Sequence, residues 1–474
     1  MKKPSAAPTD TLFDDMLELR EQVSAAAETM TARFRDEAGH DDPALANLAH
    51  YIALRQHDVR PLQRRLMARG LSSLGRLESR VLPTLDAVLG ALAFINGRPA
   101  PFPVPDEAAF FAGEKRLEDA TEALFGPVPA NRRTRIMVTL PTEAAADPAY
   151  ILDLAEHGMD CARINCAHDR PEDWRAMAAH VRAAGEATGR TITVLMDIAG
   201  PKIRTAATLP PKGRLRIGDG LRLVANGEPR IGDGAEFSAV VSLPEIVTRL
   251  AVGDRVRYDD GKVEGVVESL AEGEAVIRIR HTKAEGTKLK PEKGLNLPDT
   301  ALGLSPLTAK DTEDLTTVLE CADMIGYSFV SCPEDIDLLD EALARTDRPD
   351  RPLGLVAKIE RPDALHNLPD LIARAAKRGP FSVMIARGDL AAEIGFERLA
   401  EMQEELLWIC EAAAVPAIWA TQVLEDLVRD GTPSRGEMTD AAMAARAECV
   451  MLNKGPAVDE AIDLLDHLLG RMDG

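Results

Sequence analysis

The chain is poor in aromatic residues and in basic charge. Only 4% of its 474 residues are aromatic, so Ala, Leu and Val must fill most of the core. Its 56 Lys and Arg are outnumbered by 77 Asp and Glu, which gives a net charge of −21. General binders of nucleic acid or of anionic membranes need a basic surface. We therefore expect neither nucleic acid nor membrane as a partner.

Apolar spans and cysteine motifs are missing as well. No run of about 18 apolar residues occurs, so we expect no membrane span. The start, MKKPSAAPTDTLFDD, lacks the apolar stretch of a signal peptide. None of the six cysteines belongs to a C-x-x-C pair or to a His–Cys zinc spacing. These absences predict reduced thiols in a cytoplasmic protein.

The first part of the chain carries the pattern of helices. Apolar residues recur at helical spacing in DTLFDDMLELREQVSAAAETM and in ESRVLPTLDAVLGALAF. We predict a helical N-terminal domain over residues 1–128 and leave its role open.

From about residue 133, short apolar runs alternate with amphipathic segments. The runs are RIMVTL (135–140), CARINC (161–166), ITVLMDI (192–198), DMIGYSF (323–329), LGLVAKI (353–359), FSVMIAR (381–387), PAIWAT (416–421) and CVMLNK (449–454). Eight strands that alternate with helices predict an α/β fold, a parallel (β/α)8 TIM barrel. We assign the barrel to residues 129–205 and 298–474.

The alternation stops after the third run. The sequence RIGDG occurs at 216–220 and again at 230–234, and VGDRVRYDDGKVEG follows. Asp-Gly turns between short alternating strands indicate hairpins. We predict a small β domain over residues 206–297, inserted after the third barrel strand. Since active sites of such barrels lie at the C-terminal ends of the strands, this insertion is placed to act as a lid.

Polar side chains follow five of the predicted barrel strands. They are Arg163, Asn165 and His168; Asp197, Lys202 and Arg204; Lys358 and Glu360; Arg387 and Asp389; and Thr421 and Gln422. One such residue alone is readily explained as part of a structural ion pair, whereas five junctions together indicate a site. The several cations suit an anionic and phosphorylated substrate.

Two carboxylates and a lysine give this site a chemical direction. Lys358 and Glu360 are two residues apart on a strand, so their side chains face the same way. Glu360 and Asp389 follow neighbouring strands and could hold Mg²⁺, which takes few carboxylates together with water and substrate oxygens. A helix begins straight after Gly388, and its free N–H groups can receive a carboxylate or a phosphate. An anionic substrate, a divalent metal and a lysine together fit phosphoryl transfer.

At these residues the sequence resembles the pyruvate kinase family. LGLVAKIERPDAL (353–365) fits the family's active-site signature. ARINCAHD, MDIAGPKIRT, VRYDDG, KGLNLP, MIARGDLAAEI and ATQVLEDL are similar to its other blocks and stand in the family's order. The likeness covers residues 133–455. It implies a cytoplasmic, glycolytic kinase that converts phosphoenolpyruvate and ADP to pyruvate and ATP with Mg²⁺ or Mn²⁺, as a homo-oligomer.

The resemblance also implies roles for single residues. Lys358 would neutralise the phosphoryl group in flight and the enolate left behind, and Arg163 would grip the transferring phosphate. Glu360 and Asp389 would bind the metal.

The substrate carboxylate and the nucleotide have implied contacts of their own. The N–H groups of Gly388 and Asp389 and the hydroxyl of Thr421 would hold the carboxylate, and the Thr421 side would deliver a proton to the enolate carbon through water. The nucleotide contacts implied by the resemblance are Asn165, His168, Arg204, Asp260 and Lys293.

The potassium site of the family is altered here. Its side-chain oxygens come from Asn, Ser, Asp and Thr, and the matching positions read Asn165, Ala167, Asp197 and Ile198. Two oxygens are therefore missing. Lys202 stands where potassium-dependent members have Glu. We predict that the Lys202 ammonium substitutes for the monovalent cation and that potassium is not required.

Two further departures leave alternatives open. The loop after the eighth strand, LNKGPAVDEA, lacks the family's SGET, so the use of a nucleotide stays open. The family's C-terminal effector domain has no counterpart, and we expect no regulation through it. One alternative is a phosphoenolpyruvate/pyruvate enolate enzyme of changed reaction, of lyase or aldolase type. The other is a catalytically weak, metabolite-binding regulatory protein, which the retained polar cluster argues against because unpaired buried charge is costly.

Overall fold

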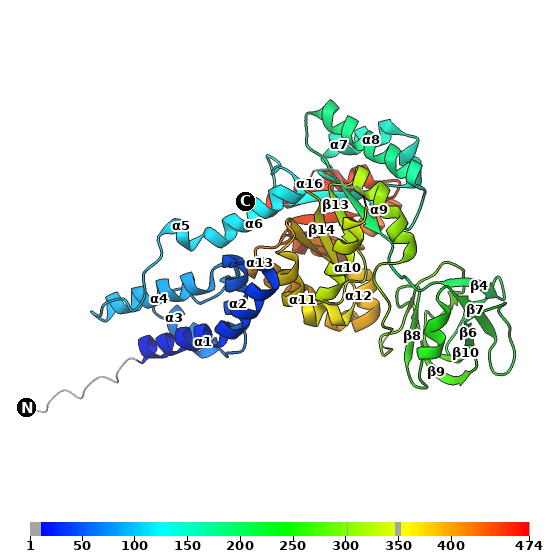
Figure 1. Ribbon diagram of the computed structural model, residues 1–474, viewed down its shortest axis with the longest axis horizontal. Helices are drawn as coiled ribbons and strands as arrows, with labels where there is room; N and C mark the ends of the chain where they lie inside the picture. The colour runs from blue at the N-terminus through cyan, green and yellow to red at the C-terminus, as the bar shows by residue number, and fades with distance from the viewer. Residues whose placement is uncertain (1–10, 301, 347–351, 474) are drawn as a thin grey trace, which may run out of the picture.

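A computed structural model describes residues 11–300, 302–346 and 352–473, and its centre is a closed barrel of eight parallel strands (Figure 1). The order around the barrel is β1-β17-β16-β15-β14-β13-β3-β2. The strands are β1 (Arg135–Thr139), β2 (Cys161–Asn165), β3 (Thr193–Ile198), β13 (Met324–Tyr327), β14 (Gly354–Ile359), β15 (Phe381–Ala386), β16 (Ala417–Ala420) and β17 (Cys449–Leu452). The first and last strands pair in parallel and close the ring. The predicted TIM barrel is confirmed.

The barrel strands are buried on both faces, which explains their continuous apolar runs. Every residue of β1, β3 and β15 is buried. Strands that are covered by helices outside and by packed side chains inside show no alternation of polar and apolar residues.

Helices follow the barrel strands and begin at sequence signals. Thr308 and Asp311 form a capping box at the start of α9, with Thr308 Oγ1 accepting the Asp311 N–H at 3.1 Å. Four of the helices have proline at their first position, where the missing N–H costs nothing. The helices are α7 (Pro148–His157), α8 (Pro171–Thr188), α9 (Ala309–Cys321), α10 (Pro333–Ala344), α11 (Pro362–Ala375), α12 (Arg387–Ile394), α13 (Phe396–Ala412), α14 (Glu425–Asp430), α15 (Arg435–Ala444) and α16 (Val458–Met472), and the 3-10 turn η2 (Thr142–Ala145) precedes α7.

Between β3 and β13 the chain leaves the barrel and forms a separate sheet with its own apolar core, called the inserted sheet below. Its strand order is β12-β8-β9-β10-β6-β7-β4, and β5 and β11 pair beside it. The elements are β4 (Thr205–Leu209), β5 (Arg214–Leu215), β6 (Gly220–Val224), β7 (Phe237–Val241), η3 (Pro244–Arg249), β8 (Arg255–Tyr258), β9 (Val263–Ala271), β10 (Glu274–His281), β11 (Thr287–Lys288) and β12 (Leu295–Asn296).

The turn predictions within this sheet had mixed outcomes. The segment YDDGKV does join two antiparallel strands, because Tyr258 of β8 pairs with Val263 of β9. The two RIGDG segments do not close hairpins of this kind. They precede β6 and β7, and these two strands pair in parallel. A parallel pair needs a longer connection than a tight turn, so the Asp-Gly signal marked turns correctly but not the partners of the strands.

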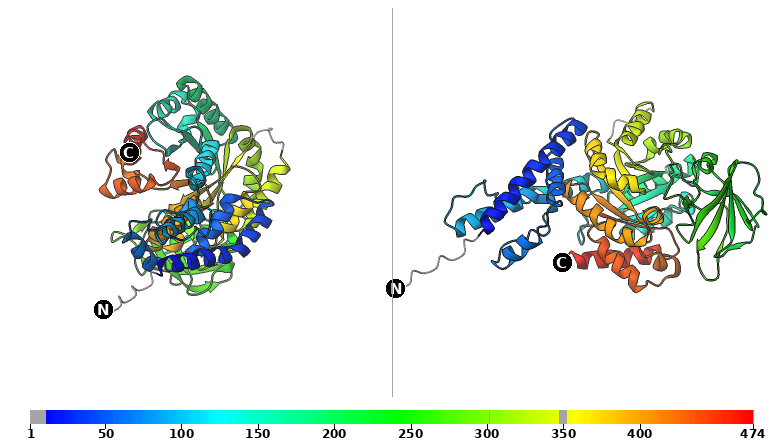
Figure 2. Two further views of the ribbon diagram at one scale, coloured as in Figure 1. Left: turned by 90° about the vertical axis from the view of Figure 1, so that its left-hand side faces the viewer. Right: turned by 90° about the horizontal axis from the view of Figure 1, so that it is seen from below.

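The chain before the barrel is helical, as the sequence pattern predicted. Its elements are α1 (Leu12–Ala38), α2 (Pro43–Leu54), α3 (Arg60–Met67), η1 (Glu78–Arg80), α4 (Val81–Ile95), α5 (Glu107–Phe110) and α6 (Ala112–Phe125). Residues 1–10, which belong to the predicted helical domain and to the segment read as lacking a signal peptide, lie outside the described residues. The helical region and the inserted sheet lie at opposite ends of the molecule, with the barrel between them (Figures 1 and 2).

The helical region is attached to the barrel by polar contacts and by apolar packing. Asn47 Nδ2 donates to the carbonyl oxygen of Ala412, on α13, at 2.8 Å, and Arg55 pairs with Glu405 of the same helix at 2.5 Å. At the end of α6, Leu124 and Phe125 join the apolar cluster that fills the barrel interior. Leu124 lies against Gly354, the first residue of β14. These two side chains therefore form the floor of the barrel at the N-terminal ends of its strands.

All six cysteines are unpaired thiols, as expected from their spacing. Within the described part of the chain, every helix is too short or too polar to cross a bilayer.

Candidate active site

Lys358 is the centre of a buried polar cluster at the carboxyl end of β14. Its Nζ lies 2.9 Å from Glu360 Oε1 and 3.2 Å from Asp197 Oδ1, and it donates to Ser328 Oγ at 2.8 Å. The Glu360 side chain is 2% exposed, and its Oε2 accepts the Phe329 N–H at 2.7 Å. Three neighbouring strands thus direct their last polar groups to one ammonium.

Arg163 extends the cluster on the other side of Asp197. Its Nε donates to Asp197 Oδ2 at 2.9 Å, its Nη2 contacts the same oxygen, and its Nη1 donates to Thr139 Oγ1 at 3.1 Å. Asp197 therefore lies between two cations, and both of them keep a small exposed fraction toward the mouth of the barrel.

The charges of the cluster balance one another. Burial acts to raise the pKa of Asp197, but Lys358 and Arg163 outweigh it and hold that pKa below its usual value. Burial acts to lower the pKa of Lys358, but Asp197 and Glu360 outweigh it and raise that pKa. Asp197 and Lys358 are therefore both charged at neutral pH, since opposite charges nearby favour the ionised forms.

Glu360 and Asp389 are close enough to repel each other. Burial raises the pKa of Glu360; the Lys358 ammonium opposes this effect, and the negative charge of Asp389 adds to it. Asp389 itself accepts hydrogen bonds from Lys202 Nζ, at 2.8 Å to Oδ1 and 3.1 Å to Oδ2. The two predicted metal ligands are thus neighbours, and their oxygens are of the type that Mg²⁺ and Mn²⁺ prefer.

Gly388 and Thr421 meet beside the metal ligands. Gly388 is in the first turn of α12, where backbone N–H groups have no partner within the helix. A Cβ at this glycine would come within 2.7 Å of Thr421 Cγ2, so only glycine allows the close approach. The structure thus places Gly388 and Thr421 side by side, and their role in holding a substrate carboxylate stays a prediction.

The residues predicted to meet a nucleotide divide into two sets. His168 lies near Arg204 and Lys454: burial lowers the pKa of His168, and the positive charges of Lys454 and Arg204 lower it further. Lys454 also lines a cavity of about 320 Å³ with Pro141, Glu143, Asp147, Tyr150 and Gly455. Asn165, at the end of β2, uses its Oδ1 to accept the Ala167 N–H at 3.1 Å.

The second set lies on the inserted sheet and is not brought to the barrel cluster. Lys293 Nζ pairs with Asp259 Oδ1 at 2.9 Å, and Asp260 follows in a left-handed turn with φ 56°. Among the described residues, neither Lys293 nor Asp260 makes a hydrogen bond or ion pair with Lys358 or His168.

The inserted sheet touches the barrel instead at the far end of α12. Arg257 Nη1 donates to the carbonyl oxygen of Ala392 at 2.8 Å. Asn296 Nδ2 donates to Glu393 Oε1 at 2.9 Å. These two contacts join the sheet to the helix whose first turn holds Gly388 and Asp389.

Two parts of the site were not predicted. Ser328 accepts from Lys358 and donates to the Ile198 carbonyl at 2.8 Å. The signal was present, because a serine stands second to last in the run DMIGYSF, where polar residues also close other runs. Asp197 was noted at a strand end and at the potassium position, but its place between Lys358 and Arg163 depends on the closing of the barrel.

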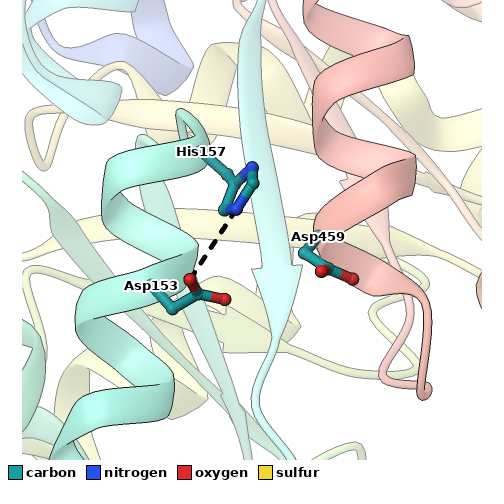
Figure 3. A group of neighbouring side chains, drawn as sticks. All are labelled: Asp153, His157 and Asp459. Carbon is teal, nitrogen blue, oxygen red and sulfur yellow. Dashed lines mark ion pairs between the residues drawn. The ribbon is translucent and has the colours of Figure 1, made fainter.

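A second carboxylate group lies on the surface. Asp153, His157 and Asp459 join α7 to α16, and they are the one trio in the described residues with ligand atoms close enough to share a metal ion (Figure 3). His157 Nδ1 also lies 2.7 Å from Asp463 Oδ1, and this hydrogen bond raises the pKa of His157. The trio is half-exposed and separate from the cluster around Lys358.

Comparison with known proteins finds similarity over the part of the chain that contains the barrel and the inserted sheet. A model described as pyruvate kinase, barrel domain, matches residues 131–460. The pyruvate kinase of Mycobacterium intracellulare is 36% identical over 327 residues, which cover 68% of this chain and 66% of that protein. The one from Agrobacterium vitis is 33% identical over 353 residues, 72% of this chain and 69% of that protein.

A solved structure gives the same picture of the fold. A pyruvate kinase from Cryptosporidium parvum superimposes with a TM-score of 0.63 at 24% identity, covering 74% of this chain and 72% of that one. The chain spans about two thirds of the length of the curated relatives, at 66% for M. intracellulare and 65% for Mycobacterium tuberculosis.

Proposed function

Because the chain belongs to the pyruvate kinase family, we propose that it is a phosphotransferase that converts phosphoenolpyruvate and ADP to pyruvate and ATP. The observation that carries the proposal is the Lys358 ammonium, held between Glu360 and Asp197 beside Arg163 at the carboxyl end of the barrel. We propose residues 129–205 and 298–474 as the catalytic barrel and residues 206–297 as its lid.

Lys358 and Arg163 supply positive charge where the transferred group would sit. Phosphoryl transfer depends mainly on positioning and on stabilising charge that spreads over the phosphoryl oxygens. Both cations are fixed by Asp197 before substrate arrives, so they need little reorganisation during the reaction. When the phosphoryl group has moved to the ADP oxygen, Lys358 remains beside the enolate oxygen of the product.

A divalent cation fits the pair Glu360 and Asp389. Burial raises the pKa of Glu360, and the negative charge of Asp389 adds to this effect. A bound Mg²⁺ or Mn²⁺ would relieve the repulsion between the two carboxylates, and carboxylates with water and substrate oxygens are the usual ligands of these ions. When bound, the metal supplies Lewis-acid neutralisation of substrate oxygens. Glu360 is held for this by the Phe329 N–H.

Gly388, Asp389 and Thr421 orient the substrate carboxylate. The N–H groups in the first turn of α12 carry the positive end of the helix dipole, which favours an anion. The Thr421 hydroxyl stands on the same side. We propose that this side delivers the proton that converts the enolate into pyruvate, through water.

The nucleotide phosphates would lie toward His168 and Arg204. Burial lowers the pKa of His168, and the positive charges of Lys454 and Arg204 lower it further. These charges suit a polyphosphate, and Lys454 contributes although the loop after β17 departs from the family. Asn165 would contact the same phosphates. Lys293 and Asp260 would reach them after movement of the inserted sheet.

Potassium is not required in this proposal. Lys202 reaches Asp389 directly, and it provides a fixed positive charge in the region where Ala167 and Ile198 remove two oxygens of a potassium site.

A coupled assay of pyruvate release with phosphoenolpyruvate, ADP and Mg²⁺ tests the function. We expect turnover in the wild type and a loss of about 100- to 1,000-fold in Lys358→Met, because that is what one preorganised charge-stabilising donor is commonly worth. Lys115→Met, at an exposed lysine on α6, is the matched control and should keep full activity.

The alternatives give different outcomes in the same set of assays. Exchange of pyruvate methyl protons with solvent deuterium, without turnover that depends on ADP, would indicate an enolate enzyme of another reaction. Binding of phosphoenolpyruvate without turnover or exchange would indicate a regulatory protein. Either result would overturn the proposed kinase activity.

A further inference from the structure

Arg387 donates hydrogen bonds to a strained segment of backbone next to the proposed substrate site. Its Nε donates to the Ala420 carbonyl at 2.9 Å and its Nη2 donates to the Thr421 carbonyl at 2.6 Å. Its guanidinium lies over the ring of Trp419, 4.5 Å from the ring centroid. One side chain thus contacts three consecutive residues at the end of β16.

The backbone that follows β16, which accepts these hydrogen bonds, has an unusual conformation. Thr421 has φ 74°, Gln422 φ 58° and Leu424 φ 48°. For a β-branched residue such as Thr421 the left-handed region is a true outlier, and such strain persists only where the surroundings hold it. Strained residues of this kind gather at functional sites, and Thr421 is the residue proposed to face the substrate.

A carboxylate fixes Arg387 in turn. Asp440, on α15, contacts Arg387 Nη1 and accepts from Nη2 at 2.8 Å. The Arg387 side chain is 11% exposed, so its guanidinium is both paired and largely buried. A planar fork that meets two carbonyls and a carboxylate at once is a geometry that lysine does not reproduce.

Arg387 also belongs to the turn that carries the other half of the site. It is the first residue of α12, directly before Gly388 and Asp389, and Gly388 packs against Thr421. The side chain therefore joins the β15–α12 junction to the neighbouring β16–α14 junction at the mouth of the barrel.

We infer that Arg387, with Asp440, is a positioning residue that holds Thr421 in its strained conformation against the first turn of α12, and so sets the place from which the enolate is protonated. The inference rests on the proposed function, because the position of Thr421 matters to catalysis only if this site handles an enolate. Arg387 itself does not touch the substrate in this scheme.

The test uses Arg387→Lys and Asp440→Asn in the full chain. Misplacing a reacting group by about 1 Å can cost about 100-fold. We therefore expect kcat for pyruvate formation and the rate of pyruvate methyl-proton exchange to fall by about that factor in Arg387→Lys, with a much smaller change in KM. Asp440→Asn keeps the shape of the pair, so its kcat and its proton-exchange rate should lie between those of Arg387→Lys and the wild type.

A structural readout keeps the inference testable apart from activity. Amide hydrogen exchange in a peptide that covers residues 417–428 should quicken in both variants, while the melting temperature shows that the chain is folded. If Arg387→Lys does not fold, Asp440→Asn supplies the answer. Arg429→Lys, at an exposed arginine on α14, is the control and should match the wild type throughout.

The outcomes separate the inference from the proposed function. Failure of the wild type to turn over phosphoenolpyruvate and ADP refutes the kinase function, and amide exchange then decides the inference about Arg387. Active wild type with both variants unchanged in amide exchange and in proton exchange overturns the inference alone. A rise in KM with unchanged kcat would also overturn it, because it would place Arg387 in binding instead of in the positioning of Thr421.

Discussion

The ammonium of Lys202 lies 2.8 Å from one oxygen of Asp389 and 3.1 Å from the other. A proposed metal ligand therefore has a cation of the chain itself as its neighbour, from a loop that follows a different barrel strand. Such a fixed cation has consequences for the ions that the protein needs.

The wild type should work equally well in potassium and in tetramethylammonium salts, because Lys202 supplies the monovalent charge. Lys202→Met should be slower, and added potassium should restore part of the rate by entering the space left by the ammonium. The rate of pyruvate release in the two salts is the measurement. Lys212→Met, at an exposed lysine of the inserted sheet, is the control. A wild-type rate that rises many-fold with potassium would refute the role of Lys202.

Asp389→Asn should weaken the binding of Mn²⁺ by at least about tenfold, the lower end of what loss of even a supporting partner costs a metal site. Titration of free Mn²⁺ by electron paramagnetic resonance measures the dissociation constant without any catalytic turnover. Asp153→Asn, in the surface trio with His157 (Figure 3), should leave the dissociation constant of the tightest Mn²⁺ site unchanged. The reverse pattern would place the metal at the surface trio and would contradict the assignment to Glu360 and Asp389.

Glu448 should make stability fall as the pH rises through the weakly acidic range. Burial raises its pKa to about 7 from an ordinary value of 4.5, although the Ala417 N–H donates to its Oε2 at 2.7 Å. Between these two values the native state holds a proton that the unfolded state has lost, so stability decreases with pH. Above about pH 7 the decrease in the free energy of unfolding is complete, and it amounts to at most roughly 3 kcal/mol.

Glu448→Gln removes this titration. Its free energy of unfolding in urea should be close to that of the wild type at pH 5 and should exceed it at pH 8. The exposed Glu272→Gln should show the same difference from wild type at both pH values. Parallel pH profiles for Glu448→Gln and the wild type would show that Glu448 titrates normally in the native state.

Arg257→Ala should loosen the end of α12, because the carbonyl of Ala392 loses the donor that the inserted sheet provides. Hydrogen exchange in a peptide covering residues 384–394 should quicken, and kcat should fall if movement of the sheet aligns the helix that carries Asp389. Arg255→Ala breaks an ion pair with Asp299 and should leave α12 unaffected. Equal exchange in α12 for both variants would show that Arg257 does not couple the sheet to the helix.

The sequence was sufficient to predict the barrel because its evidence is local. The run RIMVTL was predicted at 135–140 and forms β1 at Arg135–Thr139, and each later run forms its strand in turn. Once a parallel barrel is assumed, the residues after the strands must share one face. This is why the sequence alone predicts that Lys358 and Glu360 cluster with residues of neighbouring strands.

Contacts that depend on loop conformation could not be predicted in the same way. Lys202 and Asp389 are 187 residues apart, and no pattern of apolar and polar residues in the sequence indicates that they are in contact. The strands β6 and β7 pair in parallel, and the Asp-Gly turns do not indicate which strands pair with each other. The grip of Arg387 on Thr421 depends on a backbone conformation that residue preferences disfavour.

The floor of the barrel bears on how this protein can have evolved. The match to the family's barrel domain starts at residue 131, yet Leu124 and Phe125, which precede it, complete the packing inside the barrel. The end of α6 is therefore part of the packing of the barrel, since its removal would expose an apolar interior to water. A deletion of the helical region that leaves the barrel intact must therefore keep α6 or supply other apolar side chains for the barrel floor, so the boundary between the two segments lies before α6 and not at the first residue of the family match.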